Sequence, residues 1–383
     1  MKPTVVHACD YASDYGGNFI ASLSRLRETT LRDGWRFALL LPHEARERAW
    51  CRKLAASGWD IRFFPKDASA ARCALLLARL ALQENIRLVH THFSRFDAAA
   101  WLAAKIALVL RGRAVPVVWH CHSDFPVDMS PARKIKDLIK FRWLGGAVHI
   151  IVVSEHLKER PLSAGFDARR LHLISNGIDL SRLDGREAPP DAFGRMAARK
   201  DTAVLMFGWH PSVKGVDVAL AAFEIAARQR VDLRLFIVGT ERLRSEVARI
   251  YPNGAPAWLR LLPPVDDVAE YFRGAGIFLS ASRREGFSYS VFEAAASRCL
   301  LVSSDIAALR WAKDSIRCGW FRNEDPVELA ARIVECASLS EADRQEAARV
   351  NADFVRKHLS VEKWAEAVSG AYAGICPAGS GDE

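Results

Sequence analysis

Short apolar runs alternate with amphipathic stretches through the first half of the chain. Apolar runs of about 4–8 residues are typical of buried strands, and the stretches between them repeat apolar residues at helical spacing. We predict strands at 4–8, 35–41, 60–64, 88–92, 115–122 and 148–154, and helices at 19–32, 45–57, 70–84, 98–111, 130–144 and 155–164. Strands separated by helices in this way predict an α/β fold with a parallel sheet covered on both faces.

The same alternation starts again in the second half, after a polar segment. Residues 182–200 lose the periodic pattern and contain Pro189-Pro190, which is typical of a domain boundary. We then predict strands at 203–208, 233–239, 258–262, 276–281 and 299–303, and helices at 216–227, 242–250, 265–272, 327–336, 341–357 and 361–375, with another helix starting near Ser288. The pattern therefore predicts two doubly wound domains, 1–185 and 186–357, followed by a C-terminal segment, 358–383.

The stretch 279–297 combines a strand, a glycine-containing loop and a helix. Ser288 is a candidate N-cap, and carboxylates lie in the loop (Glu285) and in the helix (Glu293). Unpaired N–H groups and the helix dipole at such a helix start favour an anion. An ordinary β-loop-α unit with a surface glutamate would show the same pattern.

Glycines and histidines lie where other predicted strands end. Gly16-Gly17 precedes a helix, where glycine lets backbone approach a ligand, although most such pairs only make turns. His90, His92, His120 and His122 fall at strand ends, the edge where parallel sheets bind ligands. Because neighbouring residues on a strand point to opposite faces and no companion ligands are evident, we predict hydrogen-bonding or proton-handling roles rather than a metal site.

The chain of 383 residues is 50% hydrophobic and carries a formal charge of +9, distributed unevenly. Residues 1–185 contain 28 Lys and Arg against 18 Asp and Glu, whereas residues 186–383 contain 26 against 27. A basic half suits nucleic acid, an anionic membrane or phosphorylated substrates. No nucleic-acid-binding module is recognisable, so we predict membrane or phosphate partners and no nucleic acid.

Residues 130–144 are the most distinctive predicted surface element. Ser130 can cap a helix, and Pro131 suits its first position. The segment is rich in basic residues and also has an apolar face formed by Ile135, Leu138, Ile139 and Trp143. The segment is either an ordinary amphipathic helix packed on the sheet or a helix that lies on an anionic membrane surface.

Several features predict the compartment. The longest apolar run, 98–110, is too short to span a bilayer, and residues 1–8 lead into a strand rather than a long apolar signal segment. Eight cysteines are scattered without a CxxC pair, which suits reduced thiols. We expect a cytoplasmic protein, with peripheral association at the inner face of the membrane through 130–144.

An ordered set of motifs resembles the retaining GT-B glycosyltransferases of family 4. Along the chain these are Gly16-Gly17, the strand end at His122, VSEHL, LHLISNGID, FGWHPSVKGVDVALAAF and EGFSYSVFEAAA, which together cover roughly 5–372. The resemblance implies two Rossmann-like domains facing across a cleft, with the final helix packing back on the first domain. The first domain would bind the acceptor and the second the nucleotide sugar.

The resemblance also implies roles for individual residues. Lys214 would contact the donor diphosphate, Glu293 the ribose, and Glu285 the donor sugar, with His122 near the reacting sugar; we therefore take His122 and Glu285 as catalytic. The further donor-binding residues expected are Gly16, Gly17, Gly286, Phe287, Ser288, His210 and Arg283. Asn18, His92 and His120 are expected to contact the acceptor. No DxD motif occurs, so neither a metal nor another cofactor is expected.

The sequence departs from the family pattern at the donor site. Trp209 stands where the family usually has an arginine, which removes a fixed positive charge, and His210, Arg283 or Arg284 could replace it. Arg298-Cys299 and Ala307-Ala308 replace small residues and a Gly-Gly pair. These changes leave open a catalytically silent relative that acts as a binding or partner subunit.

The resulting expectation is a hexosyltransferase-type enzyme. It would transfer sugar from a UDP- or GDP-sugar, with retention of configuration, to a saccharide or lipid-linked acceptor. The pathway expected is the synthesis of a cell-surface polysaccharide, lipopolysaccharide or glycolipid. Same-face attack assisted by the leaving phosphate is the mechanism that the resemblance implies.

Overall fold

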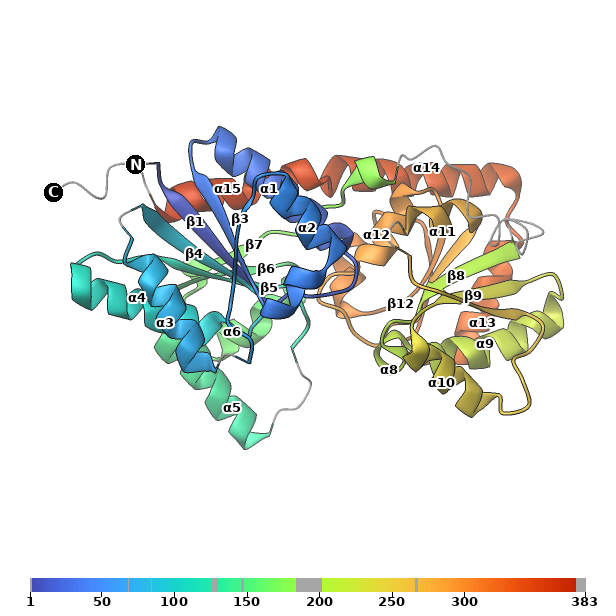
Figure 1. Cartoon of the computed structure of the whole chain (residues 1–383). Coiled ribbons are helices and arrows are strands. Elements are labelled where there is room, and N and C mark those ends of the chain that lie inside the picture. Colours follow the sequence, from blue (N-terminus) through green and yellow to red (C-terminus); the bar gives the residue numbers. More distant parts are fainter. Residues whose placement is uncertain are drawn as a thin grey trace. The chain divides into compact units, whose positions relative to one another are not determined.

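In a computed structural model, the chain folds into two compact units (Figure 1). Met1–Gly177 and Val361–Glu383 form the first unit, and Ile178–Ser360 form the second. The structure describes residues 2–67, 69–83, 85–125, 130–145, 148–183, 202–265 and 268–376.

The first unit contains a seven-stranded parallel sheet in the order β3-β2-β1-β4-β5-β6-β7. The strands are β1 (Thr4–Cys9), β2 (Arg36–Leu41), β3 (Asp60–Phe63), β4 (Ile86–His92), β5 (Val117–Cys121), β6 (Val148–Val152) and β7 (Leu171–Leu173). All six residues of β1 are buried, as expected for a central strand covered on both faces.

Helices cover both faces of this sheet (Figure 1). One face carries α1 (Gly17–Arg32) and α15 (Val361–Ile375), and the other carries α3 (Ala70–Ala81) and α4 (Asp97–Arg111). The remaining helical segments are η1 (His43–Glu47), α2 (Ala49–Ala56), α5 (Pro131–Asp137), η2 (Leu138–Leu144), η4 (Glu155–Lys158), α6 (Glu159–Ser163) and η5 (Ala168–Arg170).

Helix α15 comes from the far end of the described chain, yet it completes the core of the first unit. Trp364, Val368 and Tyr372 are buried against α1 and the sheet. Gly177 makes this approach possible, because a Cβ at residue 177 would lie 2.5 Å from the Cα of Val361. The prediction that the final helix packs back on the first domain is confirmed.

The second unit contains a six-stranded parallel sheet in the order β10-β9-β8-β11-β12-β13. The strands are β8 (Ala203–Phe207), β9 (Arg234–Val238), β10 (Leu259–Leu262), β11 (Ile277–Ser280), β12 (Leu300–Ser304) and β13 (Cys318–Phe321). The helical segments are η6 (Leu180–Arg182), α8 (Pro211–Lys214), α9 (Val216–Gln229), α10 (Glu241–Ile250), α11 (Ala269–Gly274), α12 (Tyr289–Ala296), η8 (Ala307–Ala312), α13 (Pro326–Ala337) and α14 (Glu341–His358).

The predicted α/β class and the two parallel sheets are confirmed, with local differences. Strand β13 was not predicted, because CGWF is short and lies at the sheet edge with only its last residue buried. The predicted helix 130–144 changes from α to π geometry at Leu138. The units divide at Gly177 rather than at 185, and residues 184–200 of the predicted linker lie outside the described residues.

Candidate functional site

Both sheets place the candidate residues at the point where their strand order reverses. In the first sheet this point lies between β1 and β4, and in the second between β8 and β11. Ligands of open α/β sheets bind beyond the carboxyl ends of strands at such points. The predicted donor residues follow β8 and β11, and the predicted histidines end β4 and β5.

The loops after β8 and β11 are joined by close backbone contacts. Gly215 has φ of 64°, and a Cβ there would lie 2.1 Å from the carbonyl oxygen of Ala281. The amide of Arg283 donates a hydrogen bond of 2.9 Å to the carbonyl oxygen of Val213. Only glycine can bring the two loops this near, which explains the Lys-Gly pair in the sequence.

This junction brings together two predicted donor-site residues. The ammonium Nζ of Lys214 lies 2.5 Å from Oε1 of Glu285, and the hydroxyl of Ser282 donates a hydrogen bond of 2.8 Å to the same oxygen. The side chains are 19% and 14% exposed for Lys214 and Glu285, so the pair is largely shielded from water. An incoming phosphate would compete with Glu285 for the Lys214 ammonium group.

The start of α12 has the features of an anion site. Ser288 occupies the N-cap position, but its side chain makes no capping hydrogen bond, and its buried Oγ lacks a hydrogen-bond partner among the described residues. The first turn of the helix carries no acidic residue. Backbone N–H groups at this end can therefore receive a phosphate, with Gly286 and Phe287 buried immediately before it.

Glu293 lies inside α12 and is 6% exposed. Nη1 of Arg182 lies 3.6 Å from its Oε1, within ion-pair distance. Arg182 comes from η6, shortly after the NGID motif, and was not predicted as a site residue. Arg182 lies at the start of the predicted boundary segment, so nothing in the sequence indicated a pairing with Glu293. Its position shortly after the NGID motif is the only signal that could have indicated a site residue.

Arg283 is braced by its own unit. Its guanidinium lies 2.8 Å from Asp217 Oδ2 and 2.7 Å from Glu324 Oε1. It also donates to the carbonyl oxygen of Ser212. These carboxylates raise the pKa of Arg283 and, in return, Arg283 lowers the pKa of Asp217. That another residue supplies the positive charge missing at Trp209 stays a prediction. Arg283 is a poor candidate for this role, because its guanidinium is already paired with two carboxylates.

Trp209 and His210 follow β8 directly. The Trp209 ring packs against Phe207 with centroids 5.6 Å apart and is partly buried, whereas His210 is exposed. His210 precedes α8, the single turn that ends at Lys214. An exposed imidazole at this strand end is free to meet a donor phosphate, and its role stays a prediction.

In the first unit, neighbouring side chains hold the glycine loop in place through hydrogen bonds to its backbone. The hydroxyl of Tyr11 donates to the carbonyl oxygens of Tyr15 and Gly16, and Trp50 Nε1 donates to Ser13. Gly17 has φ of 56° and begins α1. Asn18 is buried, and its side-chain amide donates to the carbonyl oxygen of Gly177 at 2.6 Å. The Asn18 side chain therefore fixes the backbone at Gly177, and its contact with an acceptor stays a prediction.

The histidines form a cluster larger than the sequence indicated. His7 on β1 and His90 and His92 on β4 lie on the sheet face that α15 covers, together with His120 and His122 from the end of β5. Their stacked rings have centroids 3.9 Å apart for His120 and His122, and 4.2 Å for His90 and His92. His7 was not predicted as a site residue. His90 was predicted only to have a hydrogen-bonding or proton-handling role, and its i, i+2 spacing from His92 places both side chains on one face.

Two strings of hydrogen bonds run through the cluster. His7 Nδ1 contacts His92 Nε2 at 2.9 Å, and His92 Nδ1 contacts His122 Nε2 at 2.9 Å. In the other string, Tyr372 Oη lies 2.5 Å from His90 Nδ1, and His90 Nε2 lies 3.2 Å from His120 Nδ1. Burial lowers the pKa of His7 and of His122 to about 3, so these imidazoles are neutral at pH 7.

The exposure of these side chains separates their predicted roles. His92 and His120 are 0% and 1% exposed, so direct contact with an acceptor would require the cluster to open. His122 is only partly buried and is the member able to meet a ligand. The acceptor-binding roles of His92 and His120 remain predictions that their burial disfavours.

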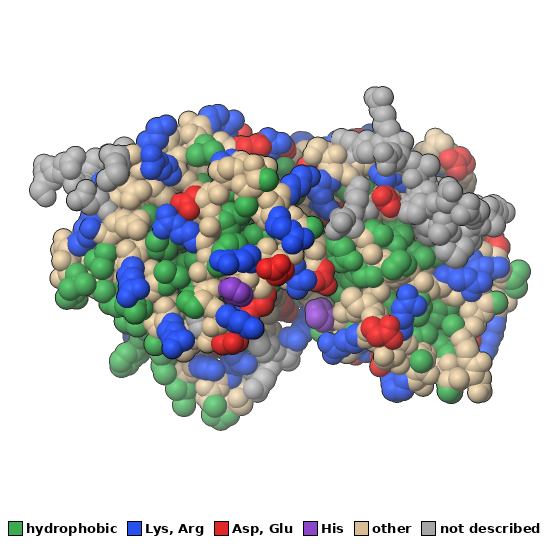
Figure 2. Space-filling view, in the orientation of Figure 1, with side chains coloured by type: hydrophobic (Ala, Val, Ile, Leu, Met, Phe, Trp, Pro, Cys, Tyr) green, Lys and Arg blue, Asp and Glu red, His purple; other side chains and the backbone are tan. Residues whose placement is uncertain are grey.

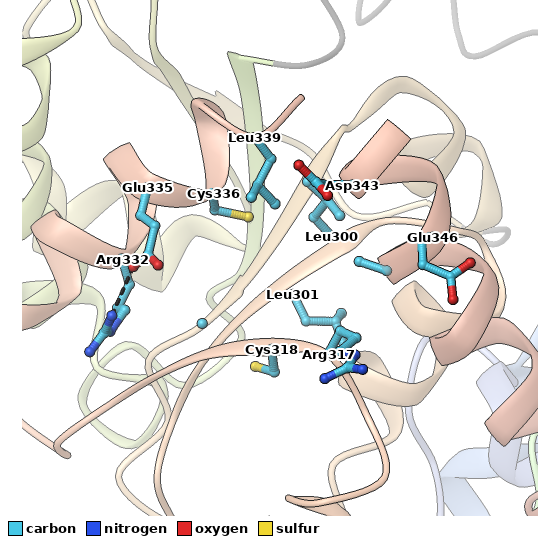
Figure 3. A pocket seen from close by; sticks show the side chains of 12 residues that line it. Leu300, Leu301, Arg317, Cys318, Arg332, Glu335, Cys336, Leu339, Asp343 and Glu346 are labelled. Carbon is cyan, nitrogen blue, oxygen red and sulfur yellow. Dashed lines mark hydrogen bonds and ion pairs between the residues drawn. The ribbon is translucent and has the colours of Figure 1, made fainter. Parts of the chain in front are cut away.

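A cavity in the second unit lies apart from these residues. Its volume is about 470 Å³, and Figure 3 shows Leu300 and Leu301 of β12, Cys318 of β13 and Cys336 of α13 around it. Leu300 begins β12, so the cavity lies toward the amino end of that strand, opposite the edge that carries Lys214 and Glu285. None of its lining residues belongs to the predicted donor site.

Comparison with known families matches most of the chain. Residues 23–182 match Glycosyltransferase Family 4, and residues 201–338 match Glycosyl transferases group 1. The chain therefore belongs to the family-4, group-1 glycosyltransferases.

Curated relatives carry one shared name. The D-inositol 3-phosphate glycosyltransferase of Geodermatophilus obscurus is 24% identical over 294 residues, covering 70% of this chain and 64% of the relative. That of Streptomyces scabiei is 25% identical over 271 residues, covering 63% of this chain and 58% of the relative. The chain thus spans less than two thirds of the length of these relatives.

Solved structures show the fold. A glycosyltransferase from Rickettsia africae superposes with a TM-score of 0.78 at 17% identity, covering 98% of this chain and 99% of that one. Anabaena HepE in complex with UDP-glucose superposes with a TM-score of 0.74 at 15% identity, covering 97% and 99%. The fold class is that of the GT-B glycosyltransferases, as the motif resemblance predicted.

Proposed function

We propose that the chain transfers a hexosyl group from a UDP- or GDP-sugar to a saccharide or lipid-linked acceptor, with retention of configuration. The observation that carries this proposal is the Lys214–Glu285 contact at 2.5 Å beside the α12 helix start. It sets one cation, one carboxylate and a set of backbone N–H groups at one sheet edge. The structure of HepE in complex with UDP-glucose supports a UDP-sugar as the first donor to test.

The chemistry of glycosyl transfer accounts for this set of groups. Departure of a nucleoside diphosphate builds negative charge on phosphate oxygens, which Lys214 and the start of α12 would stabilise. The sugar carbon becomes cationic, and the Glu285 carboxylate would stabilise it or orient sugar hydroxyls. Glu293, held by Arg182, would accept hydrogen bonds from the ribose hydroxyls.

Retention is proposed to follow same-face attack assisted by the leaving phosphate. Retaining hydrolases instead use two carboxylates about 5 Å apart, one of which is the nucleophile. Here the oxygen of Glu285 is already engaged by Lys214 and Ser282, which suits an electrostatic role better than a nucleophilic one. The steps proposed for this chain involve no metal at the donor site.

The acceptor class is proposed from charge and from relatives. The first half carries 28 Lys and Arg against 18 Asp and Glu, which favours an anionic acceptor. The relatives named D-inositol 3-phosphate glycosyltransferase support a phosphorylated polyol as one acceptor to test. A lipid-linked saccharide for a surface polysaccharide or glycolipid carries the same anionic chemistry.

Membrane association is proposed through α5 and η2, at the cytoplasmic face. The apolar residues of this segment point to solvent: Ile135 is 60%, Leu138 44%, Ile139 49% and Trp143 72% exposed. The neighbouring Lys134, Lys136 and Arg142 are also exposed. Figure 2 shows hydrophobic side chains on the lower surface of the first unit, where α5 lies in Figure 1. Within the described residues, no helix is both long and apolar enough to cross a bilayer.

The packing of this segment supports the membrane interpretation of residues 130–144 over packing on the sheet. Phe141 is buried, and Lys140 Nζ lies 2.7 Å from Asp97 Oδ2, so one side of the segment is attached to α4. The apolar face that could have packed on the sheet is exposed instead. An apolar face flanked by lysines is complementary to an anionic membrane surface.

A test of the transfer reaction compares donors and then acceptors. Calorimetric titration with UDP-, GDP- and ADP-sugars should show binding of one class, and that donor should be consumed when phosphorylated polyol or lipid-linked saccharide acceptors are added. Glu285→Gln should bind the donor without turnover. If wild-type protein binds no nucleotide sugar, the proposed reaction is wrong.

A catalytically silent relative is the second candidate function. Trp209 favours it, because the family's usual arginine is absent and Arg283 is already paired with Asp217 and Glu324. Such a protein would bind a nucleotide sugar or a partner subunit without turnover. Donor binding with no hydrolysis or transfer across the acceptor panel would favour this candidate.

A further inference from the structure

The geometry points to a transition-metal site in the first unit, and we propose that His92, His120 and His122 are its ligands. One ring nitrogen from each of these residues lies within 4.8 Å of the others. His92 ends β4, its register partner His120 lies on β5, and His122 follows β5 directly, so neighbouring strands set their spacing. Three histidines on one face are a common ligand set for Zn²⁺.

The positions of the ring nitrogens indicate which atom of each histidine would bind the metal. His92 Nδ1 and His122 Nε2 face each other at 2.9 Å. His120 Nε2 is buried and has no hydrogen-bond partner in the part of the chain that the structure describes. A metal held by these three atoms would give the His120 nitrogen the partner it lacks, and burying such a polar atom without a partner is unfavourable.

The second nitrogen of two ligands is already oriented by a neighbour. His92 Nε2 contacts His7 Nδ1 at 2.9 Å, and His120 Nδ1 contacts His90 Nε2 at 3.2 Å. Metal-ligating histidines typically use their other ring nitrogen in this way, which fixes the tautomer and the ring orientation. His90 is itself held by Tyr372 Oη at 2.5 Å.

A second group, made of His7, His90 and His92, also has nitrogens within 4.8 Å of one another. His90 is a poor ligand there, because Tyr372 and His120 engage its two nitrogens. The three histidines of this second group are also fully buried. His122 of the first group is partly exposed and gives an ion a route from solvent. These differences favour the site that includes His122.

The ligand chemistry indicates the class of ion. Neutral imidazoles suit Zn²⁺, Co²⁺, Ni²⁺ and Cu²⁺, whereas Mg²⁺ and Ca²⁺ require oxygen ligands. Adjacent side chains on a strand point to opposite faces, and this alternation disfavours a metal site formed by neighbouring residues. His120 and His122 are two residues apart and therefore share a face, and His92 from the neighbouring strand is their companion ligand. The inference concerns metal binding by this chain and does not depend on the proposed transfer reaction.

Metal titration of untagged, chelator-treated protein tests the site. We expect one Zn²⁺ per chain by calorimetry and, with Co²⁺, visible absorption typical of tetrahedral coordination. His120→Asn should abolish this binding, and His7→Asn should weaken it about 10–100-fold through loss of ligand orientation. His149→Asn is the matched control, because it also removes one histidine of a hydrogen-bonded pair in the first unit, and it should bind normally.

X-ray absorption of the wild-type zinc complex gives a measurement that needs no variant. It should show three imidazole nitrogens at about 2.0–2.1 Å from the metal. This result decides the question if His120→Asn does not fold. The proposal is overturned if wild-type protein shows no saturable binding of one ion, if folded His120→Asn binds like wild type, or if fewer than three imidazoles coordinate.

Discussion

Lys214 and Glu285 are 71 residues apart in sequence, yet Nζ of the lysine lies 2.5 Å from Oε1 of the glutamate. The contact depends on two loops that follow adjacent parallel strands, β8 and β11. Without a donor the two charges neutralise each other. A bound diphosphate would draw Lys214 toward phosphate and release Glu285 toward the sugar, so donor binding itself would prepare the carboxylate.

Removing the ammonium group should weaken diphosphate binding. Lys214→Met is expected to lower the affinity for UDP roughly 10–100-fold, since a hydrogen bond to a charged group contributes about 1.5–3 kcal/mol. Calorimetry measures this, with Lys105→Met on α4 as a control for loss of one positive charge. An unchanged UDP affinity in Lys214→Met would place the diphosphate elsewhere.

Gly215 should be the residue on which the junction depends. Gly215→Ala places a Cβ against the carbonyl of Ala281 and should lower the free energy of unfolding by about 2–4 kcal/mol, as severe core strain does. Gly254→Ala is the control, because Gly254 also has positive φ (106°) but no atom within 4 Å of its Cβ position. It should cost only about 1 kcal/mol. Equal losses in denaturant unfolding would show that backbone conformation, not the loop contact, determines the requirement.

The missing charge at residue 209 can be supplied. Trp209→Arg should raise the affinity for UDP about 5–10-fold if the side chain at this strand end faces the diphosphate. Trp209→Ala separates the effect of removing the ring from that of adding a charge. Titration of the three proteins with UDP gives the comparison, and an arginine variant no tighter than the alanine variant would contradict this placement.

The segment formed by α5 and η2 should anchor the protein to anionic vesicles. Lys134→Glu with Lys136→Glu should reduce co-sedimentation with phosphatidylserine-containing vesicles, since each basic residue near such a surface contributes about 1 kcal/mol. Lys140 is excluded from this test because Asp97 holds it.

A charge control for this membrane test comes from the second unit. Arg356→Glu with Lys357→Glu makes the same change of charge on exposed positions of α14. If both double variants lose binding equally, total charge rather than this segment attracts the vesicles. Trp143→Ser should also reduce binding, through loss of exposed apolar surface.

A histidine pair outside the cluster should make stability depend on pH. Burial, followed by His172 and Arg170, lowers the pKa of His149 from 6.5 to about 4, and Asp167 opposes this. Between these values the unfolded chain binds a proton that the folded chain does not, so stability falls as pH drops from 6.5 toward 4.

Replacing this histidine tests the direction of the effect. His149→Asn should lose less stability than wild type between pH 6.5 and 4 in denaturant unfolding. The exposed His358→Asn serves as the control and should follow wild type. Identical pH slopes for all three proteins would mean that His149 keeps its ordinary pKa.

Much of the fold could be predicted from the sequence, because buried parallel strands are nearly continuous apolar runs. Strand β13 escaped prediction, since an edge strand with polar flanks lacks that signal. Among site residues, Lys214 and Glu285 belong to recognisable motifs. Arg182 and His7 do not, because their significance depends on partners, Glu293 and His92, that are distant in sequence.

The return of α15 to the first unit has a consequence for biosynthesis. Val361, Trp364, Ala365, Val368 and Tyr372 contribute to a core whose other buried residues are synthesised before Gly177. The ribosome must therefore make the whole second unit before the first can close its core. During that interval α15 does not yet cover its part of the sheet face, and transiently exposed apolar surface of this kind is prone to aggregation.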